Sequence, residues 1–97
     1  MIEWEWEPKK DAQNRRKHGL DLATGVLVLA DPLAASRPDP YPEEARWQTL
    51  GSAGGIAVLF VSHTEPTRRP DGRLVGRIIG VRKATAHERK AYEAGRF

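Results

Sequence analysis

The chain has 97 residues, a formal net charge of +3 at neutral pH and no cysteine. Its length predicts one domain over residues 1–97, and the absence of thiols excludes disulfides, cysteine nucleophiles and cysteine-ligated metal sites. The longest apolar run, residues 56–61, is far shorter than the roughly 18 residues of a membrane span, and no leader pattern is present. We therefore expect a cytoplasmic protein without membrane contact.

The N-terminal segment predicts a strand followed by a helix. Apolar and acidic residues alternate over residues 2–7, the period of a strand with one buried face. Pro8 suits the first turn of a helix, which we expect over Lys9–His18 because Gly19 can end it in the left-handed conformation.

A second helix is predicted over Asp21–Ala30. Leu22, Val26 and Leu29 follow the i, i+4, i+7 spacing of a helix with one apolar side. Gly25 and the two valines weaken this pattern, so a buried strand is the alternative.

The rest of the chain predicts a loop, three strands and a final helix. Four prolines mark residues 31–44 as a loop. Strands are expected at 46–50, 56–64 and 74–82, separated by a glycine-rich turn at 51–55 and a polar turn at 65–72. Thr85 and Glu88 match a capping box, so the last helix should run from Ala86 to about Ala94.

This order, β-α-α-β-β-β-α, predicts a small α+β protein. Three consecutive strands with tight turns favour an antiparallel sheet, with the helices packed on one face. The other face of the sheet would then be open.

The charge is unevenly distributed along the chain. Residues 21–45 hold one basic and five acidic side chains, whereas residues 46–97 hold ten basic and four acidic ones. Eleven of the sixteen basic residues are arginine, which suits bidentate phosphate contacts. The C-terminal half therefore suits a polyanion such as RNA or DNA, although a solubilising surface would have the same composition.

Two histidines are candidates for acid–base chemistry, since the ordinary pKa of histidine is nearest to neutral pH. His18 lies at a predicted helix end, where a cation is also favoured by the helix dipole. His63 has the parity of Leu59 and Val61, so the alternative for it is a partly buried, hydrogen-bonded side chain.

Arg77 and Arg82 lie in the last predicted strand, where a charge needs a carboxylate or an anionic ligand. Strict alternation places the two arginines on opposite faces, so they can share a site only if a bulge intervenes. One of them is expected to pair with Glu88 or Glu93.

Several catalytic patterns are missing from the sequence. No acidic cluster at metal-ligand spacing accompanies the histidines, and neither a phosphate-binding P-loop nor a nucleophile elbow is present. We therefore expect no metal and no cofactor. The composition leaves two options, a protein that binds nucleic acid and a ribonuclease that uses the 2′-hydroxyl of its substrate.

Several ordered blocks of residues resemble the BrnT family, the ribonuclease toxins of type II toxin–antitoxin pairs. The blocks are Trp6-x3-Lys10-x3-Asn14-x2-Lys17-His18-Gly19, Asp31-Pro32, Arg46 ahead of Gly51, Val61-x-His63-Thr64, and Arg77-x-Ile79-x2-Arg82-x-Ala84-x3-Glu88-Arg89-x2-Tyr92-Glu93. The family usually has serine where this chain has Gly80. The resemblance implies a RelE-like α+β fold and an RNA endonuclease.

The resemblance also implies metal-independent cleavage through attack of the 2′-hydroxyl on phosphorus. The candidates for acid–base work are His63 and His18. Arg82, Arg77 and Lys17 are expected to stabilise the charge on phosphorus. Arg46, Lys83 and Arg89 are expected to hold flanking phosphates.

The implied partner is a cognate antitoxin with a DNA-binding domain, which would form a hetero-oligomeric complex and bring the toxin to operator DNA. An acidic or amphipathic antitoxin segment could cover the basic surface. The alternative is a binding module without catalysis, a basic partner subunit of a DNA-bound repressor. An unrelated small α+β protein with a basic surface is the third possibility.

Overall fold

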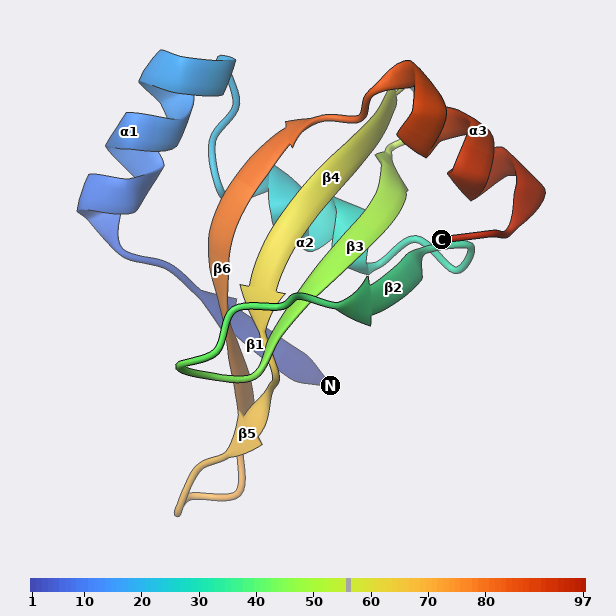
Figure 1. The fold of residues 1–97 in the computed structure, drawn as a ribbon. Helices are drawn as coiled ribbons and strands as arrows, with labels where there is room; N and C mark the ends of the chain where they lie inside the picture. The colour runs from blue at the N-terminus through green and yellow to red at the C-terminus, as the bar shows by residue number, and fades with distance from the viewer. Residues whose placement is uncertain (56) are drawn as a thin grey trace.

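A computed structural model describes residues 1–55 and 57–97 and contains the predicted elements together with two short additional strands (Figure 1). The elements are β1 (Ile2–Glu5), α1 (Pro8–His18), α2 (Thr24–Leu29), β2 (Ala35–Pro38), β3 (Arg46–Ala53), β4 (Ala57–Thr64), β5 (Thr67–Arg68), β6 (Leu74–Lys83) and α3 (Ala86–Ala94). Ile56, the first residue of one predicted strand, lies outside the described residues. No helix in the described part of the chain has the length and apolar character needed to cross a membrane.

The sheet is mixed, with the strand order β1-β6-β4-β3-β2 and with β5 also paired to β6. β1 runs parallel to β6, so the prediction of an antiparallel sheet is wrong for this edge. The connection from β1 passes through α1, α2 and four strands, and such a long connection permits parallel pairing. The other neighbouring strands pair antiparallel.

The sheet has helices on both faces, which corrects the prediction that they lie on one. We call the face covered by α2 the back face and the opposite one the front face (Figure 1). The back-face core consists of Leu22, Val28, Leu59, Val61, Ile78 and Val81. The front-face core is smaller and consists of Leu50, Phe60 and Ala84, with Tyr92 of α3 packed against it.

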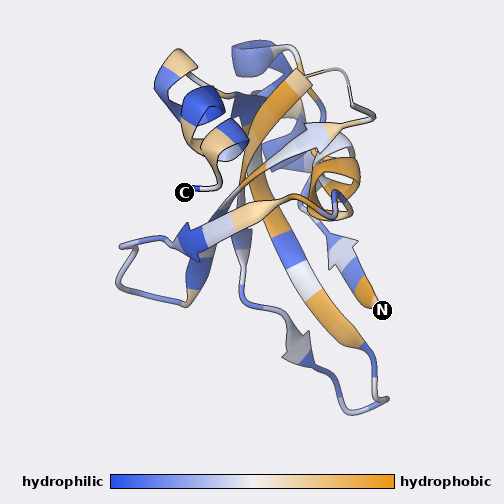
Figure 2. Ribbon diagram, turned by 90° about the vertical axis from the view of Figure 1, so that its right-hand side faces the viewer, coloured by the Kyte–Doolittle hydropathy of each residue, from blue (hydrophilic) through white to orange (hydrophobic). Residues whose placement is uncertain are grey.

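The helices differ in polarity according to their positions. α2 is almost entirely hydrophobic and lies behind the sheet, whereas α1 is hydrophilic (Figures 1 and 2). In Figure 1, α1 and α3 stand on either side of the front face, and neither helix lies over its middle. The face predicted to be open is therefore covered in part by helices.

Gly51 belongs to β3 and not to the predicted turn at residues 51–55. A Cβ atom at this position would lie 2.8 Å from the carbonyl oxygen of Val28, so only glycine allows α2 to approach the strand this closely. The hairpin turn is formed further on, where Gly54 has a φ of +65° and Gly55 a φ of +75°.

The ends of α1 and α3 agree with the sequence patterns. Gly19 follows α1 in the left-handed conformation, and its N–H donates to the carbonyl oxygen of Arg15. Thr85 and Glu88 form the predicted capping box of α3. The second helix is shorter than predicted because Asp21 accepts hydrogen bonds from the backbone and hydroxyl of Thr24 in a turn before it.

β6 contains a bulge opposite the end of β4. Ser62 pairs with Gly80, but the next residue, His63, pairs with Ile78, which leaves Ile79 as an extra residue. The extra residue shifts the alternation of β6 by one position. Side chains before and after the bulge that would have pointed to opposite faces therefore point to the same face.

Asn14 joins α1 to β6 directly after this bulge. Its side-chain amide donates to the carbonyl oxygens of Leu20 and Val81, at 2.8 Å each, and its Oδ1 accepts from the N–H of Val81 at 3.1 Å. The side chain thus takes the place of a neighbouring strand at the outer edge of β6, and it is only 8% exposed. These hydrogen bonds fix α1 against β6 at the part of the strand that follows the bulge.

Replacing Asn14 with alanine should destabilise the fold strongly. The change leaves two carbonyl groups and one N–H without these partners, and an unpaired buried polar group costs about 1–3 kcal/mol. We expect the free energy of unfolding, measured by urea denaturation, to fall by roughly 2–4 kcal/mol. The exposed neighbour Gln13→Ala is the control and should change little; a loss below about 1 kcal/mol for Asn14→Ala would contradict this role.

Candidate functional site

Three arginines of the front face lie on two of its strands: Arg46 on β3, and Arg77 and Arg82 on β6. Arg77 precedes the bulge and Arg82 follows it, so both lie on the front face although alternation alone separates them. Arg46 on β3 lies opposite Thr64 on β4, and the backbone N–H of Arg77 donates to the hydroxyl of Thr64 at 2.9 Å. The bulge that the sequence analysis named as the condition for a shared site is present.

Arg46 and Arg77 meet at a single carboxylate oxygen. Oε1 of Glu44 accepts from Nε of Arg46 and from a terminal guanidinium nitrogen of Arg77, both at 2.8 Å. Arg46, the largest cause, and Arg77 hold the pKa of the Glu44 carboxyl below its ordinary value of 4.5. Glu44 is therefore ionised at neutral pH and keeps the two guanidinium groups close together.

The guanidinium group of Arg46 is also stacked on an aromatic ring. Its central carbon lies 3.7 Å from the centre of the Tyr41 ring, on the segment that connects β2 to β3. In Figure 1 this segment passes in front of the sheet. It therefore carries Tyr41 and Glu44 onto the front face.

Arg82 is held by one aromatic ring and one carboxylate. Its guanidinium group lies 3.9 Å from the centre of the Phe60 ring and donates to both oxygens of Glu88, at 2.8 and 3.1 Å. The predicted ion pair with Glu88 is thus confirmed. The hydrogen bond from Arg82, the largest cause, lowers the pKa of Glu88.

A polar row crosses the front face between these arginines. Arg37, Gln48, Ser62 and Gly80 lie opposite one another on β2, β3, β4 and β6. A Cβ atom at Gly80 would lie 3.8 Å from the hydroxyl oxygen of Ser62. The neighbouring strand therefore provides a hydroxyl beside the position where the resemblance expects a serine.

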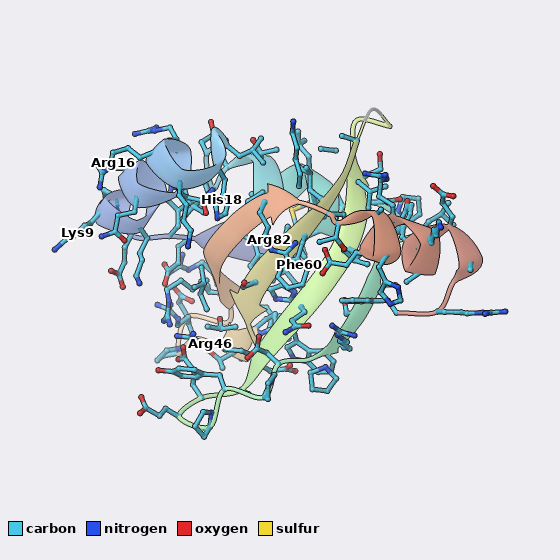
Figure 3. All side chains as sticks on the ribbon, turned by 45° about the horizontal axis from the view of Figure 1, so that its top comes forward. Lys9, Arg16, His18, Arg46, Phe60 and Arg82 are labelled. Atoms are coloured by element: carbon cyan, nitrogen blue, oxygen red, sulfur yellow. The ribbon has the colours of Figure 1, made fainter. Side chains whose placement is uncertain are left out.

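Lys10, Asn14 and His18 form a stripe along α1. Residues four apart lie above one another on a helix, and Asn14 contacts β6, so Lys10 and His18 flank that contact. Lys10 lines a small cavity of about 90 Å³ with Arg46 and Arg77. Figure 3 shows His18 between α1 and the strand that carries Arg82, whereas Lys9 and Arg16 point away from the sheet.

His63 lies on the back face and does not join the arginines. It is 6% exposed, packs edge-on against Trp4 at 5.0 Å and lines an apolar groove beside α2. Its Nδ1–H donates to the carbonyl oxygen of Thr64 at 3.1 Å, so Nε2 accepts from the hydroxyl of Thr49 at 2.7 Å. Burial, the largest cause, lowers the pKa of His63 and keeps the ring neutral.

The other predicted residues lie outside the group of front-face arginines. Lys17 is exposed on the last turn of α1, and Arg89 is exposed on α3. Lys83 lies opposite Leu59, with the parity of the back face. The structure therefore brings together Arg46 and Arg77, sets Arg82 on the same face, and leaves Lys17, Lys83 and Arg89 outside this group.

We call Lys10, His18, Glu44, Arg46, Arg77 and Arg82 the front-face cluster. Sequence reasoning did not select Lys10 and Glu44 as site residues. The signal for Lys10 was its i, i+4, i+8 spacing with Asn14 and His18, and the signal for Glu44 was its position two residues before Arg46.

The front-face cluster suits a phosphodiester. A guanidinium group has five N–H donors, and Glu44 uses one nitrogen of Arg46 and one of Arg77. The remaining donors can bind phosphate oxygens in bidentate pairs. Across residues 1–55 and 57–97, no three His, Asp or Glu side chains converge in a way that could hold a metal ion.

A family model described as the ribonuclease toxin BrnT of type II toxin–antitoxin systems matches residues 6–88. Among solved structures, the chain is similar to the crystal structure of the Brucella abortus ribonuclease toxin BrnT. The two share 23% sequence identity and a TM-score of 0.60, and the likeness covers 88% of this chain and 99% of the other. At this identity the solved structure supports the fold alone. No curated protein matches the chain.

The burial of neutral His63 predicts a stability that depends on pH. The pKa of His63 in the folded chain lies below its ordinary value of 6.5, so its contribution is complete above pH 6.5 and decreases as the pH falls towards the folded pKa. In urea denaturation between pH 7.5 and 5, the free energy of unfolding of the parent should exceed that of His63→Gln by an amount that shrinks as the pH falls. An advantage that is constant across this range would contradict the buried neutral ring.

Proposed function

Because the chain belongs to the BrnT family of ribonuclease toxins of type II toxin–antitoxin systems, we propose that the front face of its sheet is the site of RNA cleavage. The observation that carries this proposal is the convergence of Arg46 and Arg77 on one anionic oxygen, at 2.8 Å each. An RNA phosphate presents the same kind of oxygen. The side chains of Arg46 and Arg77 are 23% and 37% exposed, so a single strand can reach them.

The proposed reaction needs no metal ion. The ribose 2′-oxygen loses its proton and attacks the adjacent phosphorus, and the bond from phosphorus to the 5′-oxygen breaks. The products are a 2′,3′-cyclic phosphate and a 5′-hydroxyl. The phosphodiester carries one negative charge, and a second develops on its oxygens as the deprotonated 2′-oxygen attacks. Fixed cations stabilise such charge most effectively.

The roles follow from the positions of the side chains. Arg77 and Arg46 bind the reacting phosphate, and Arg82 stabilises its charge from the same face. Lys10 and Lys17 of α1 attract the flanking backbone. His18 lies beside this face and donates the proton that the leaving 5′-oxygen requires (Figure 3).

His63 is assigned a structural role, which revises the expectation from the sequence. Its ring nitrogens are occupied by Thr64 and Thr49, and the sheet separates it from Arg77 and Arg82. A general base must reach the proton it removes within hydrogen-bond distance or through one water. Lys83 and Arg89 lie outside the front-face cluster, so they are proposed to contact only distant phosphates.

We further propose that a cognate antitoxin with a DNA-binding domain inhibits the toxin by covering the front face. The cations of this face favour an acidic segment, and the electrostatic match would also speed association. The resulting hetero-oligomer would reach operator DNA through the antitoxin. Both proteins would act in the cytoplasm, where RNA is available.

Arginine substitutions on the front face should abolish cleavage. The assay uses the purified chain, freed of antitoxin, with a long single-stranded RNA in EDTA. We expect Arg77→Ala and Arg82→Ala to reduce the cleavage rate by roughly 100-fold or more, the usual effect of removing one donor to a transition-state oxyanion. Cyclic-phosphate ends on the products would identify attack by the 2′-hydroxyl.

Arg16→Ala is the matched control, because it removes the same charge from a side chain that points away from the sheet (Figure 3). It should cleave RNA like the parent. Undiminished cleavage by Arg77→Ala and Arg82→Ala would overturn the proposed site. RNA binding without cleavage by the parent would favour a binding module, or an enzyme that requires the ribosome, and adding ribosomes distinguishes these two.

A further inference from the structure

The reaction proposed above requires a group that removes the proton of the 2′-hydroxyl, and the neutral His63 lies on the other face. Four carboxylates of the described chain lie beside the front-face arginines or on the same face, those of Glu7, Asp39, Glu44 and Glu88. Glu7 lines the cavity of Lys10, Arg46 and Arg77, but no hydrogen bond from a described residue fixes its side chain. The hydrogen bonds of the other three decide which one is held in place and still has an oxygen free for substrate.

Two of these carboxylates are fully engaged. Both oxygens of Glu88 bind Arg82, and Oε1 also accepts from the N–H of Thr85 in the capping box. The side chain of Glu88 is 13% exposed. Asp39 accepts from the backbone of Tyr41 through Oδ1 and from Gln48 through Oδ2.

Glu44 is held through one oxygen only. Oε1 binds Arg46 and Arg77, whereas Oε2 accepts no hydrogen bond from the residues that the structure describes. The side chain is 35% exposed and lines a hollow of about 300 Å³ beside Thr64 and Arg77. A carboxylate fixed at one oxygen and open at the other is oriented and still able to accept a proton.

From this geometry we propose that Glu44 is the general base of the cleavage reaction. The proposal rests on the proposed function, because it uses the same phosphate site. With the phosphate on Arg46 and Arg77, Oε2 of Glu44 takes the proton of the 2′-hydroxyl while the 2′-oxygen forms its bond to phosphorus. The 5′-oxygen leaves with its bonding electron pair and receives a proton from His18 or water.

The charges around Glu44 keep it in its basic form. Arg46 on β3 and Arg77 on β6 contact it, and Arg69, Glu5 and Glu65 line the same hollow. Arg69 is paired with Glu5 at 2.8 Å. The guanidinium groups hold the pKa of Glu44 below 4.5, so the carboxylate is available as a base throughout the neutral range.

The test compares Glu44→Gln with the parent in the EDTA cleavage assay. Glutamine keeps an oxygen that can accept from the arginines but removes the proton acceptor, so we expect cleavage to fall by roughly 100-fold or more. Binding of a 2′-O-methyl RNA, which cannot be cleaved, should be retained. The residual rate of the variant should rise about tenfold per pH unit, as hydroxide replaces the base, while the parent, whose carboxylate is already ionised, should show no such rise.

Glu43→Gln is the matched control, since Glu43 lies on the same segment and accepts only from the hydroxyl of Tyr41 among the described residues. It should cleave like the parent. Glu44→Gln with equal or faster cleavage would overturn the proposal and leave Glu44 as a counterion of the arginines. A parent that cleaves no RNA, either alone or with added ribosomes, would overturn the proposed function as well, so the two failures are distinguishable.

Discussion

In β6, Ile79 has no partner in β4, because Ser62 pairs with Gly80 and His63 pairs with Ile78. This single extra residue brings Arg77 to the face that carries Arg82. Without it, the guanidinium group of one arginine would lie among the apolar side chains under α2, where a charge is costly. The bulge therefore keeps both guanidinium groups out of the apolar core, and it creates the cationic face in the same step.

The surroundings of the bulge keep this arrangement in place. Asn14 pairs with both backbone groups of Val81, so the edge of β6 is satisfied where β1 no longer accompanies it. The same side chain positions α1, and with it Lys10 and His18, along the front face. At the other side, the bidentate pair of Arg82 with Glu88 ties α3 to β6. The bonds that stabilise the fold are thus also the bonds that place the proposed site.

Patterns within the chain predicted the local elements well, but they could not predict long-range pairing. The capping box of α3 and the glycine after α1 involve neighbouring residues, and both are present. The parallel pairing of β1, the strand β2 inside a proline-rich segment and the bulge depend on partners far away in sequence. Alternation predicted the back-face parity of His63, and the structure shows that this parity, rather than its chemistry, determines its environment. Glu44 became visible as a candidate only when Arg46 and Arg77 were seen to meet at its carboxylate.

In this account, RNA binds and is cleaved on the front face of the sheet. Backbone amide NMR shifts test it most directly, during titration with a short 2′-O-methyl RNA that binds but cannot be cleaved. The account predicts the largest shifts at Arg46, Ser62, Arg77 and Gly80, with Thr49 and the α2 residues unmoved. Shifts concentrated around the back-face groove beside His63 and Trp47, with the front face unchanged, would contradict it.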